Sequence, residues 1–372
     1  MVAHLNPGTC PLLVVKVGSS LLVEKDGAVR RDWLQTLVAD IAKRHKAGQK
    51  IVVVSSGAIA LGARRLGFEK GGRASLADAQ ASASVGQILL SGIWAELLAE
   101  QGLTAAQMLV TLDDLEDRRR YLNITATLDR LLGAGAVPVF NENDSVATEE
   151  IRFGDNDRLA ARVGQAAGAN GVVLLSDVDG LYDRDPRDPE AQLVPEVAKV
   201  DGRIRIMVSG DSSSGMGSGG MASKLDAADI ATRAGIGLAI ASGLRANPLA
   251  ALDDGAPYTW FAPREGGSAR KGWIGGRLSV KGRITVDNGA AKALRGGASL
   301  LPAGATAVQG EFRRGDVIDI VSIDGETLAR GLSEYDAGDA TLICGKRSGE
   351  LEGILGAVPR QVLVHRDQMV LL

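Results

Sequence analysis

Short, wholly apolar runs alternate with segments of helical spacing from residue 12 to about residue 241, and this alternation constrains the fold more than any other feature. Because the runs are apolar throughout and not at every second position, they are typical of strands covered on both faces. The runs lie at 12–15, 51–54, 137–140, 172–175 and 238–241. Apolar residues recur at helical spacing at 32–46, 79–98, 118–132 and 222–234. We therefore expect an α/β fold, with an open, mainly parallel sheet and helices on both faces.

From about residue 281 the pattern changes to short alternating segments separated by Gly-Asp, Asp-Gly and Asp-Asn-Gly turns. These segments predict strands at 283–286, 317–320 and 361–364, with helical spacing only at 290–294. Residues 253–277 contain two prolines and many glycines, which is typical of a linker. We expect a first domain at 1–258, a linker at 259–280 and a small β-rich domain at 281–372.

Composition excludes several classes of protein. The chain has 42 basic and 45 acidic residues, a net charge of −3, so it lacks the basic excess of proteins that bind nucleic-acid phosphates. The two cysteines, Cys10 and Cys344, exclude a disulfide scaffold, and three scattered histidines argue against a zinc site. We find neither a signal peptide nor an apolar stretch of the roughly 18 residues that a membrane span needs. We expect a soluble, cytoplasmic protein.

Polar clusters follow the predicted strands, and in open α/β sheets ligands bind at the carboxyl ends of strands. The first, at 16–20, is Lys-Val-Gly-Ser-Ser, and the second, at 55–57, is Ser-Ser-Gly at the start of a predicted helix. Both can direct an ammonium group or backbone N–H groups at an anion. Taken alone, the first also fits a surface lysine before a turn, and the second fits a plain serine N-cap.

A third cluster, at 141–144 and 154–157, holds seven carboxylates or carboxamides. Such a cluster beside a buried strand is costly to leave unpaired, which favours a charged substrate or a metal over a solvated acidic loop.

A fourth cluster joins Ser176-Asp177 to a glycine-rich run at 215–221, which leads into Ser223-Lys224. Bare glycines let backbone N–H groups approach phosphate oxygens, although a flexible surface loop has the same composition. The run is not a Walker A loop, because Met221 stands where that motif needs its lysine. Two lysines, glycine loops and grouped acids suit phosphoryl transfer. We find no Ser–His or Cys–His pairing that suggests an acyl-transfer nucleophile.

Together these motifs resemble those of the bacterial glutamate 5-kinases, a branch of the amino acid kinase family. The resemblance is carried by Lys16-x-Gly-Ser-Ser, Ser55-Ser-Gly-Ala-Ile, Asn141-Glu-Asn-Asp, Gly154-Asp-Asn-Asp, Ser176-Asp177 with Gly180-Leu-Tyr, and Gly219-Gly-Met-x-Ser-Lys. Residues 282–290, 299–302 and 315–316 resemble the PUA domain that follows in that family. The resemblance covers nearly the whole chain and implies the amino acid kinase fold followed by a small β-rich PUA domain.

The resemblance implies ATP-dependent phosphorylation of the γ-carboxylate of L-glutamate to L-glutamyl 5-phosphate. This reaction is the first step of proline biosynthesis, and feedback inhibition by proline is implied with it. Lys16 and Lys224 would embrace the transferred phosphoryl group, and Asp157 would hold the two lysines in place. Mg²⁺ would be held mainly by the nucleotide phosphates, with no metal ligand from the protein.

The implied binding residues fall into two sets. Those for the substrate are Ser56, Gly57, Asp144, Asp155 and Asn156, with Asp144 suited to the α-ammonium group and Asn156 to a carboxylate. Those for ATP are Lys16, Ser176, Asp177, Ser218, Gly219, Gly220, Met221, Ala222, Ser223 and Lys224.

The resemblance also implies a homo-oligomer, either dimer or tetramer, and functional coupling to glutamyl phosphate reductase. PUA domains elsewhere bind RNA, but residues 281–372 carry 11 basic and 12 acidic residues, so RNA binding is disfavoured. A modulatory or assembly role is favoured over a purely structural one. The alternatives are an acetylglutamate kinase, which needs room for an N-acyl group, and an RNA-binding protein. A catalytically inactive regulator is a third, and the presence of Lys16, Asp157 and Lys224 argues against it.

Overall fold

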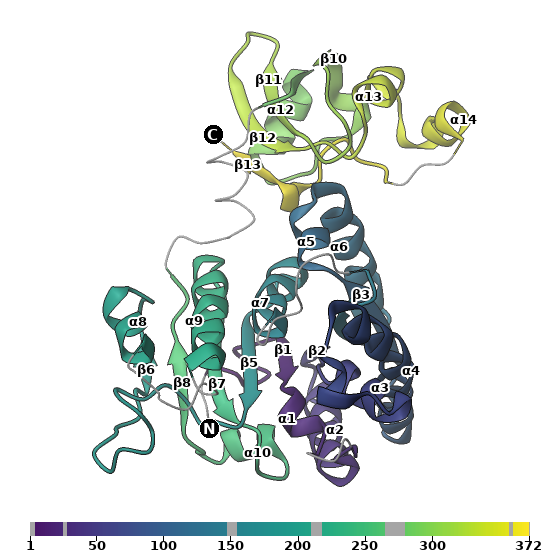
Figure 1. Ribbon diagram of the computed structural model, residues 1–372. Coiled ribbons are helices and arrows are strands. Elements are labelled where there is room, and N and C mark those ends of the chain that lie inside the picture. The colour runs from purple at the N-terminus through teal and green to yellow at the C-terminus, as the bar shows by residue number, and fades with distance from the viewer. Residues whose placement is uncertain are drawn as a thin grey trace. The chain divides into compact units, whose positions relative to one another are not determined.

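The computed structural model describes residues 4–24, 28–146, 155–209, 218–264, 280–356 and 360–371. The chain divides into two compact units, residues 1–266 and 267–372 (Figure 1).

The first unit is built on an eight-stranded sheet in the order β3-β4-β2-β1-β5-β7-β8-β6, parallel except where β7 meets β8. Its strands are β1 (Leu12–Val17), β2 (Lys50–Val54), β3 (Ala105–Val110), β4 (Val137–Glu142), β5 (Gly171–Ser176), β6 (Glu196–Val197), β7 (Gly237–Ser242) and β8 (Tyr258–Phe261). The expected open, mainly parallel sheet is confirmed, and all five predicted apolar runs are strands. The sequence did not predict β3, β6 or β8.

Helices pack against both faces of this sheet, as the wholly apolar strands require. Leu13 and Val15 of β1 lie in a core shared with α2 and α4. Val14, between them, points to the opposite face and is equally buried where α7 lies against β1. The helices are α1 (Ser19–Leu22), α2 (Arg31–Lys46), α3 (Ala58–Leu66), α4 (Leu76–Glu100), α5 (Leu112–Glu116), α6 (Arg118–Gly133), α7 (Asp155–Ala167), α8 (Gly202–Ser209), α9 (Ser218–Arg233) and α10 (Pro248–Asp253).

The expectation that no segment is long and apolar enough to span a membrane does not hold for helix α4. Over an 18-residue window its mean hydropathy is 1.3, which meets that description by length and composition alone. The helix belongs to the folded unit, because Trp94 and Leu97 lie in the core and Glu96 pairs with Arg31 of α2 at 2.8 Å. A core helix of a globular protein passes the same hydropathy test.

The expected linker starts later than residue 259. Residues 258–261 form β8, whose main chain pairs with that of β7, so they belong to the first sheet. Thr259, Trp260 and Phe261 are all buried there, which the neighbouring prolines hid from the sequence pattern. Residues 265–279 lie outside the described residues.

The second unit is a five-stranded sheet in the order β10-β9-β11-β12-β13, in which only β9 and β11 are parallel. The expected β-rich domain and its strands at 283–286 and 317–320 are confirmed. The prediction of a strand at 361–364 is wrong, because the described chain there forms only a single β-bridge, between Leu300 and Val364. The elements are β9 (Gly282–Val286), α12 (Asn288–Arg295), β10 (Ala305–Gly310), β11 (Val317–Ser322), β12 (Thr327–Leu332), α13 (Ala337–Ile343), α14 (Leu351–Leu355) and β13 (Met369–Leu371). Helices α13 and α14 are additions to the one predicted helix.

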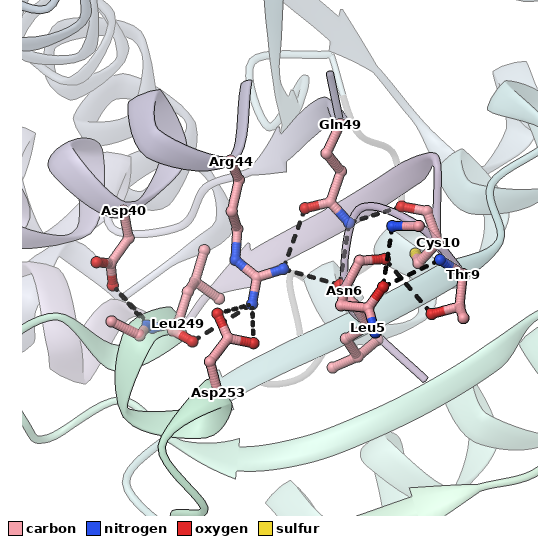
Figure 2. Close-up of polar contacts among 11 residues, drawn as sticks. Leu5, Asn6, Thr9, Cys10, Asp40, Arg44, Gln49, Leu249 and Asp253 are labelled. Atoms are coloured by element: carbon pink, nitrogen blue, oxygen red, sulfur yellow. Dashed lines mark hydrogen bonds and ion pairs between the residues drawn. The ribbon is translucent and has the colours of Figure 1, made fainter. Parts of the chain in front are cut away.

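A buried arginine ties the N-terminal segment to α10 (Figure 2). Arg44 of α2 donates to the carbonyl oxygen of Leu5 at 2.8 Å and to Gln49 Oε1 at 3.1 Å. Its other terminal nitrogen donates to both carboxylate oxygens of Asp253 at 2.9 Å. Gln49 Nε2 in turn donates to the carbonyl oxygens of Leu5 and Cys10. One guanidinium therefore satisfies groups from three separate segments.

Replacing Arg44 with methionine is expected to lower the free energy of unfolding by about 2–4 kcal/mol, because buried acceptors lose their donor. Urea denaturation followed by circular dichroism measures the change. The control is Arg65→Met, since Arg65 is exposed on α3. Equal denaturation midpoints for the two variants would contradict the structural role given to Arg44.

Candidate active site

Two lysines and one aspartate meet at the carboxyl end of the central strands. Lys16 comes from the end of β1, Asp157 from the first turn of α7 and Lys224 from α9. Lys16 Nζ lies 2.5 Å from Asp157 Oδ1, and Lys224 Nζ lies 3.2 Å from Asp157 Oδ2. All three side chains are buried, Asp157 almost completely. The structure thus brings together the three residues expected to be catalytic.

The aspartate is ionised in this arrangement. Burial by itself raises the pKa of Asp157, but the charges of Lys16 and Lys224 outweigh that effect and hold the pKa below its ordinary value. With one carboxylate between two ammonium groups, the cluster carries a net charge of +1. A buried positive cluster of this kind can bind and stabilise an anion such as a transferring phosphoryl group.

A second group of side chains forms a hydrogen-bonded chain beside the first. Asn156 Nδ2 donates to Ser56 Oγ at 2.9 Å and to Asn141 Oδ1 at 3.3 Å. Asn141 Nδ2 donates to Oε1 of Gln87, on α4, at 2.7 Å. Asn156 was expected to serve a carboxylate, but both of its N–H groups are already used within the protein. Asn156 Oδ1 is buried and accepts no hydrogen bond from the described residues.

The other residues expected at the substrate lie before α3, in the turn after β4 and at the start of α7. Gly57 precedes α3 with a φ of 100°, a left-handed conformation that favours glycine, so the chain turns sharply after Ser56. Asp144 is buried in the turn after β4, and its neighbour Ser145 shares a 3.0 Å hydroxyl contact with Ser84 of α4. Asp155 begins α7, and its side chain is outside the described residues.

The residues expected at the nucleotide lie at the carboxyl end of β5 and in the first turns of α9. Ser176 Oγ donates to Asp177 Oδ1 at 3.0 Å, at the end of β5, which pairs directly with β1. Lys224 Nζ also donates to the carbonyl oxygen of Gly220 at 3.3 Å. In the same first turns of α9, Met221 and Ser223 are half-buried and Ala222 is exposed. The side chains of Ser218 and Gly219 are outside the described residues, as is the glycine run at 215–217.

Comparison with known proteins gives the family to which the chain belongs. The sequence model of the amino acid kinase family matches residues 11–242. The chain belongs to the amino acid kinase family. A second sequence model, that of the PUA domain, matches residues 282–355.

Curated relatives resemble this amino acid kinase over almost its whole length. Glutamate 5-kinase from Novosphingobium aromaticivorans is 65% identical over 98% of this chain and 97% of its own. Glutamate 5-kinase from Sphingopyxis alaskensis is 62% identical over 98% of this chain and 99% of its own. Among solved structures, UMP kinase from Ureaplasma parvum superposes with a TM-score of 0.46 and 17% identity, over 68% of this chain and 98% of its own.

The amino acid kinase site offers no ready-made metal cage in the part of the chain that the structure describes. Those residues contain no group of three or more His, Cys, Asp or Glu side chains placed to hold a metal ion. The carboxylate of Asp157 is already paired with two lysines.

Two residues of α4 reach the site without having been singled out from the sequence. Gln87 hydrogen-bonds Asn141, and the fully buried Trp94 donates from Nε1 to Ser55 Oγ at 2.9 Å. They are seven residues apart, or two helical turns, so they lie on one face of the helix. The sequence did contain a signal for these two residues: a glutamine and a tryptophan seven residues apart in a helix that is otherwise rich in alanine and leucine.

Proposed function

We propose that this amino acid kinase transfers the γ-phosphoryl group of ATP to the γ-carboxylate of L-glutamate, forming L-glutamyl 5-phosphate in proline biosynthesis. The observation that carries the proposal is the buried cluster in which Asp157 holds Lys16 and Lys224 together. The high identity to two proteins named glutamate 5-kinase supports the choice of substrate.

The chemistry needs positioning and charge more than proton transfer. A γ-carboxylate oxygen of glutamate attacks the γ-phosphorus, a new P–O bond forms, and the bond to the β,γ-bridging oxygen breaks to release ADP. Glutamate needs no general base, because its side-chain pKa of about 4.3 leaves it ionised at neutral pH. The barrier is repulsion between anions. Lys16 and Lys224 reduce it by placing positive charge on the phosphoryl oxygens, and Asp157 keeps both lysines oriented.

We assign the substrate to Ser56, Gly57, Asp144, Asp155 and Asn156. The turn at Gly57 brings the start of α3 next to Ser56, where free N–H groups of a helix suit a carboxylate. The buried carboxyl group of Asp144 suits the α-ammonium group.

We assign the ATP-binding site to the carboxyl end of β5 and the first turns of α9. Ser176 and Asp177 line the nucleotide site, and residues 218–224 follow the phosphates, ending at Lys224. Mg²⁺, when bound, would neutralise charge on the β- and γ-phosphates and would take its ligands mainly from phosphate and water oxygens.

The family resemblance supports further expectations about the whole protein. These are inhibition by proline, assembly into a dimer or tetramer, coupling to glutamyl phosphate reductase and a cytoplasmic location. The PUA unit is proposed to modulate the kinase or its assembly, without binding RNA. We place the linker within 265–280, because Arg264 still bonds the carbonyl oxygen of Thr232 in α9 and the second sheet begins at Gly282.

The deciding assay measures Mg²⁺-dependent ADP release from ATP with L-glutamate, N-acetylglutamate or L-aspartate, with hydroxylamine added to trap an acyl phosphate. Turnover with L-glutamate alone, giving the hydroxamate, is the expected result. Turnover only with N-acetylglutamate would make the protein an acetylglutamate kinase. No turnover with any of the three would overturn the proposed activity.

A further inference from the structure

A line of amide side chains connects helix α4 to the substrate side of the candidate site. It runs from Gln87 through Asn141 and Asn156 to Ser56, with donor–acceptor distances of 2.7, 3.3 and 2.9 Å. Asn141 is almost fully buried, and Ser56 is buried as well. Gln87 and Asn156 are half-buried, but the Oδ1 atom of Asn156 is itself buried, so its partner must come from the protein or from a ligand.

The hydrogen bonds along this line all run the same way from donor to acceptor. Gln87 presents its oxygen as an acceptor, so the nitrogen of Asn141 donates to Gln87 and the oxygen of Asn141 accepts from Asn156. Asn156 must then use its nitrogen within the protein, where it donates to Asn141 and Ser56. What remains is Asn156 Oδ1, a buried acceptor without a donor among the described residues. A buried acceptor of this kind is costly unless a donor reaches it, which points to a group that arrives with the substrate.

Helix α4 is well placed to hold this direction. Besides Gln87, it sends Trp94 to Ser55 and Ser84 to Ser145, so it contacts the loops that follow both β2 and β4. Those loops carry Ser56 and Asp144, the residues assigned to the substrate.

We propose that Gln87 is a positioning residue that fixes the amide of Asn156 with its oxygen toward the substrate, so that Asn156 accepts from the α-ammonium group of glutamate. The proposal rests on the proposed function. It makes the site selective for an amino acid over the corresponding dicarboxylate, which has the same carboxylates and no ammonium group.

The test compares Gln87→Met, which removes the acceptor at similar size, with Gln87→Glu, whose carboxylate accepts but cannot donate. For Gln87→Met we expect the KM for glutamate to rise about tenfold, the loss of roughly one well-placed hydrogen bond. The kcat and the KM for ATP should change less than about twofold, because the lysine cluster is untouched. Gln87→Glu should keep a KM for glutamate near that of the wild type, because it imposes the same direction on Asn141.

Glutarate, which lacks the ammonium group, separates positioning from general damage. As a competitor of glutamate, its inhibition constant should be the same for the wild type and for Gln87→Met. Gln35→Met, at an exposed glutamine of α2, is the control for the substitution itself. The melting temperature of each variant checks folding.

If the wild type turns over glutamate normally, three results would overturn the inference about Gln87 and leave the proposed function standing. They are an unchanged KM in Gln87→Met, a KM in Gln87→Glu as high as in Gln87→Met, or weaker glutarate binding in parallel with glutamate. The second would mean that the amide nitrogen of Asn156 faces the substrate. A wild-type enzyme that does not use glutamate would overturn the proposed function itself.

Discussion

Replacing Lys224 with alanine is expected to lower kcat by about 100- to 1,000-fold, the usual cost of losing one charge-stabilising donor at a reacting centre. In the structure Lys224 shares Asp157 with Lys16, so its removal takes away half of the positive charge proposed to face the transferred phosphoryl group. The KM for glutamate should change much less than kcat, because the substrate is assigned to other residues. ADP release at saturating ATP and glutamate measures the effect.

The control for this variant is Lys199→Ala, since Lys199 lies in the same unit and is exposed. It should keep wild-type turnover. The kcat of Lys16→Ala should fall by a factor similar to that of Lys224→Ala, because both lysines contact the same carboxylate. Near-normal turnover in Lys224→Ala, with an unchanged melting temperature, would show that the phosphoryl clamp has been assigned to the wrong lysine.

The parts of the fold that the sequence predicted are those in which local pattern and burial agree. Strands such as β1 and β5 are fully buried, and apart from Lys16 and Ser176 near their carboxyl ends they carry no polar side chain, so the pattern is unmistakable. Edge strand β3 is half-exposed and reads Ala-Ala-Gln-Met-Leu-Val, which satisfies no simple period. Strand β8 lies between prolines, and its antiparallel pairing with β7 is a long-range choice that no local pattern encodes.

The candidate site divides in the same way. Lys16, Asp157 and Lys224 could be named because strand-end motifs and the family resemblance both marked them. Their joint contact depends on three elements that are far apart in sequence. The direction of the Asn156 amide could not be predicted, because it is set by Gln87, a residue two side chains away on another element. A sequence motif gives the residue type but not which amide atom faces the ligand.

Replacing Gly86 with alanine is expected to lower the free energy of unfolding by about 3 kcal/mol or more. Helices α3 and α4 touch through their backbones at this point. An added methyl group at Gly86 would lie 1.7 Å from the carbonyl oxygen of Ala58, and one at Gly62 would lie 1.7 Å from that of Ser82. Because those neighbours are backbone atoms, the whole helix must move. Thermal unfolding followed by circular dichroism measures the loss.

Helix α4 contains its own matched control. Gly92 is exposed, and an added methyl group there would meet no atom within 4 Å. Gly92→Ala should therefore raise the free energy of unfolding by up to about 1 kcal/mol, because alanine favours the helix. The two substitutions are chemically identical and lie six residues apart, so opposite signs isolate the helix contact. If both variants melted at the same temperature, α3 and α4 would not be in backbone contact. Since Gln87 adjoins Gly86, a shifted α4 should also raise the KM for glutamate in Gly86→Ala and leave it unchanged in Gly92→Ala.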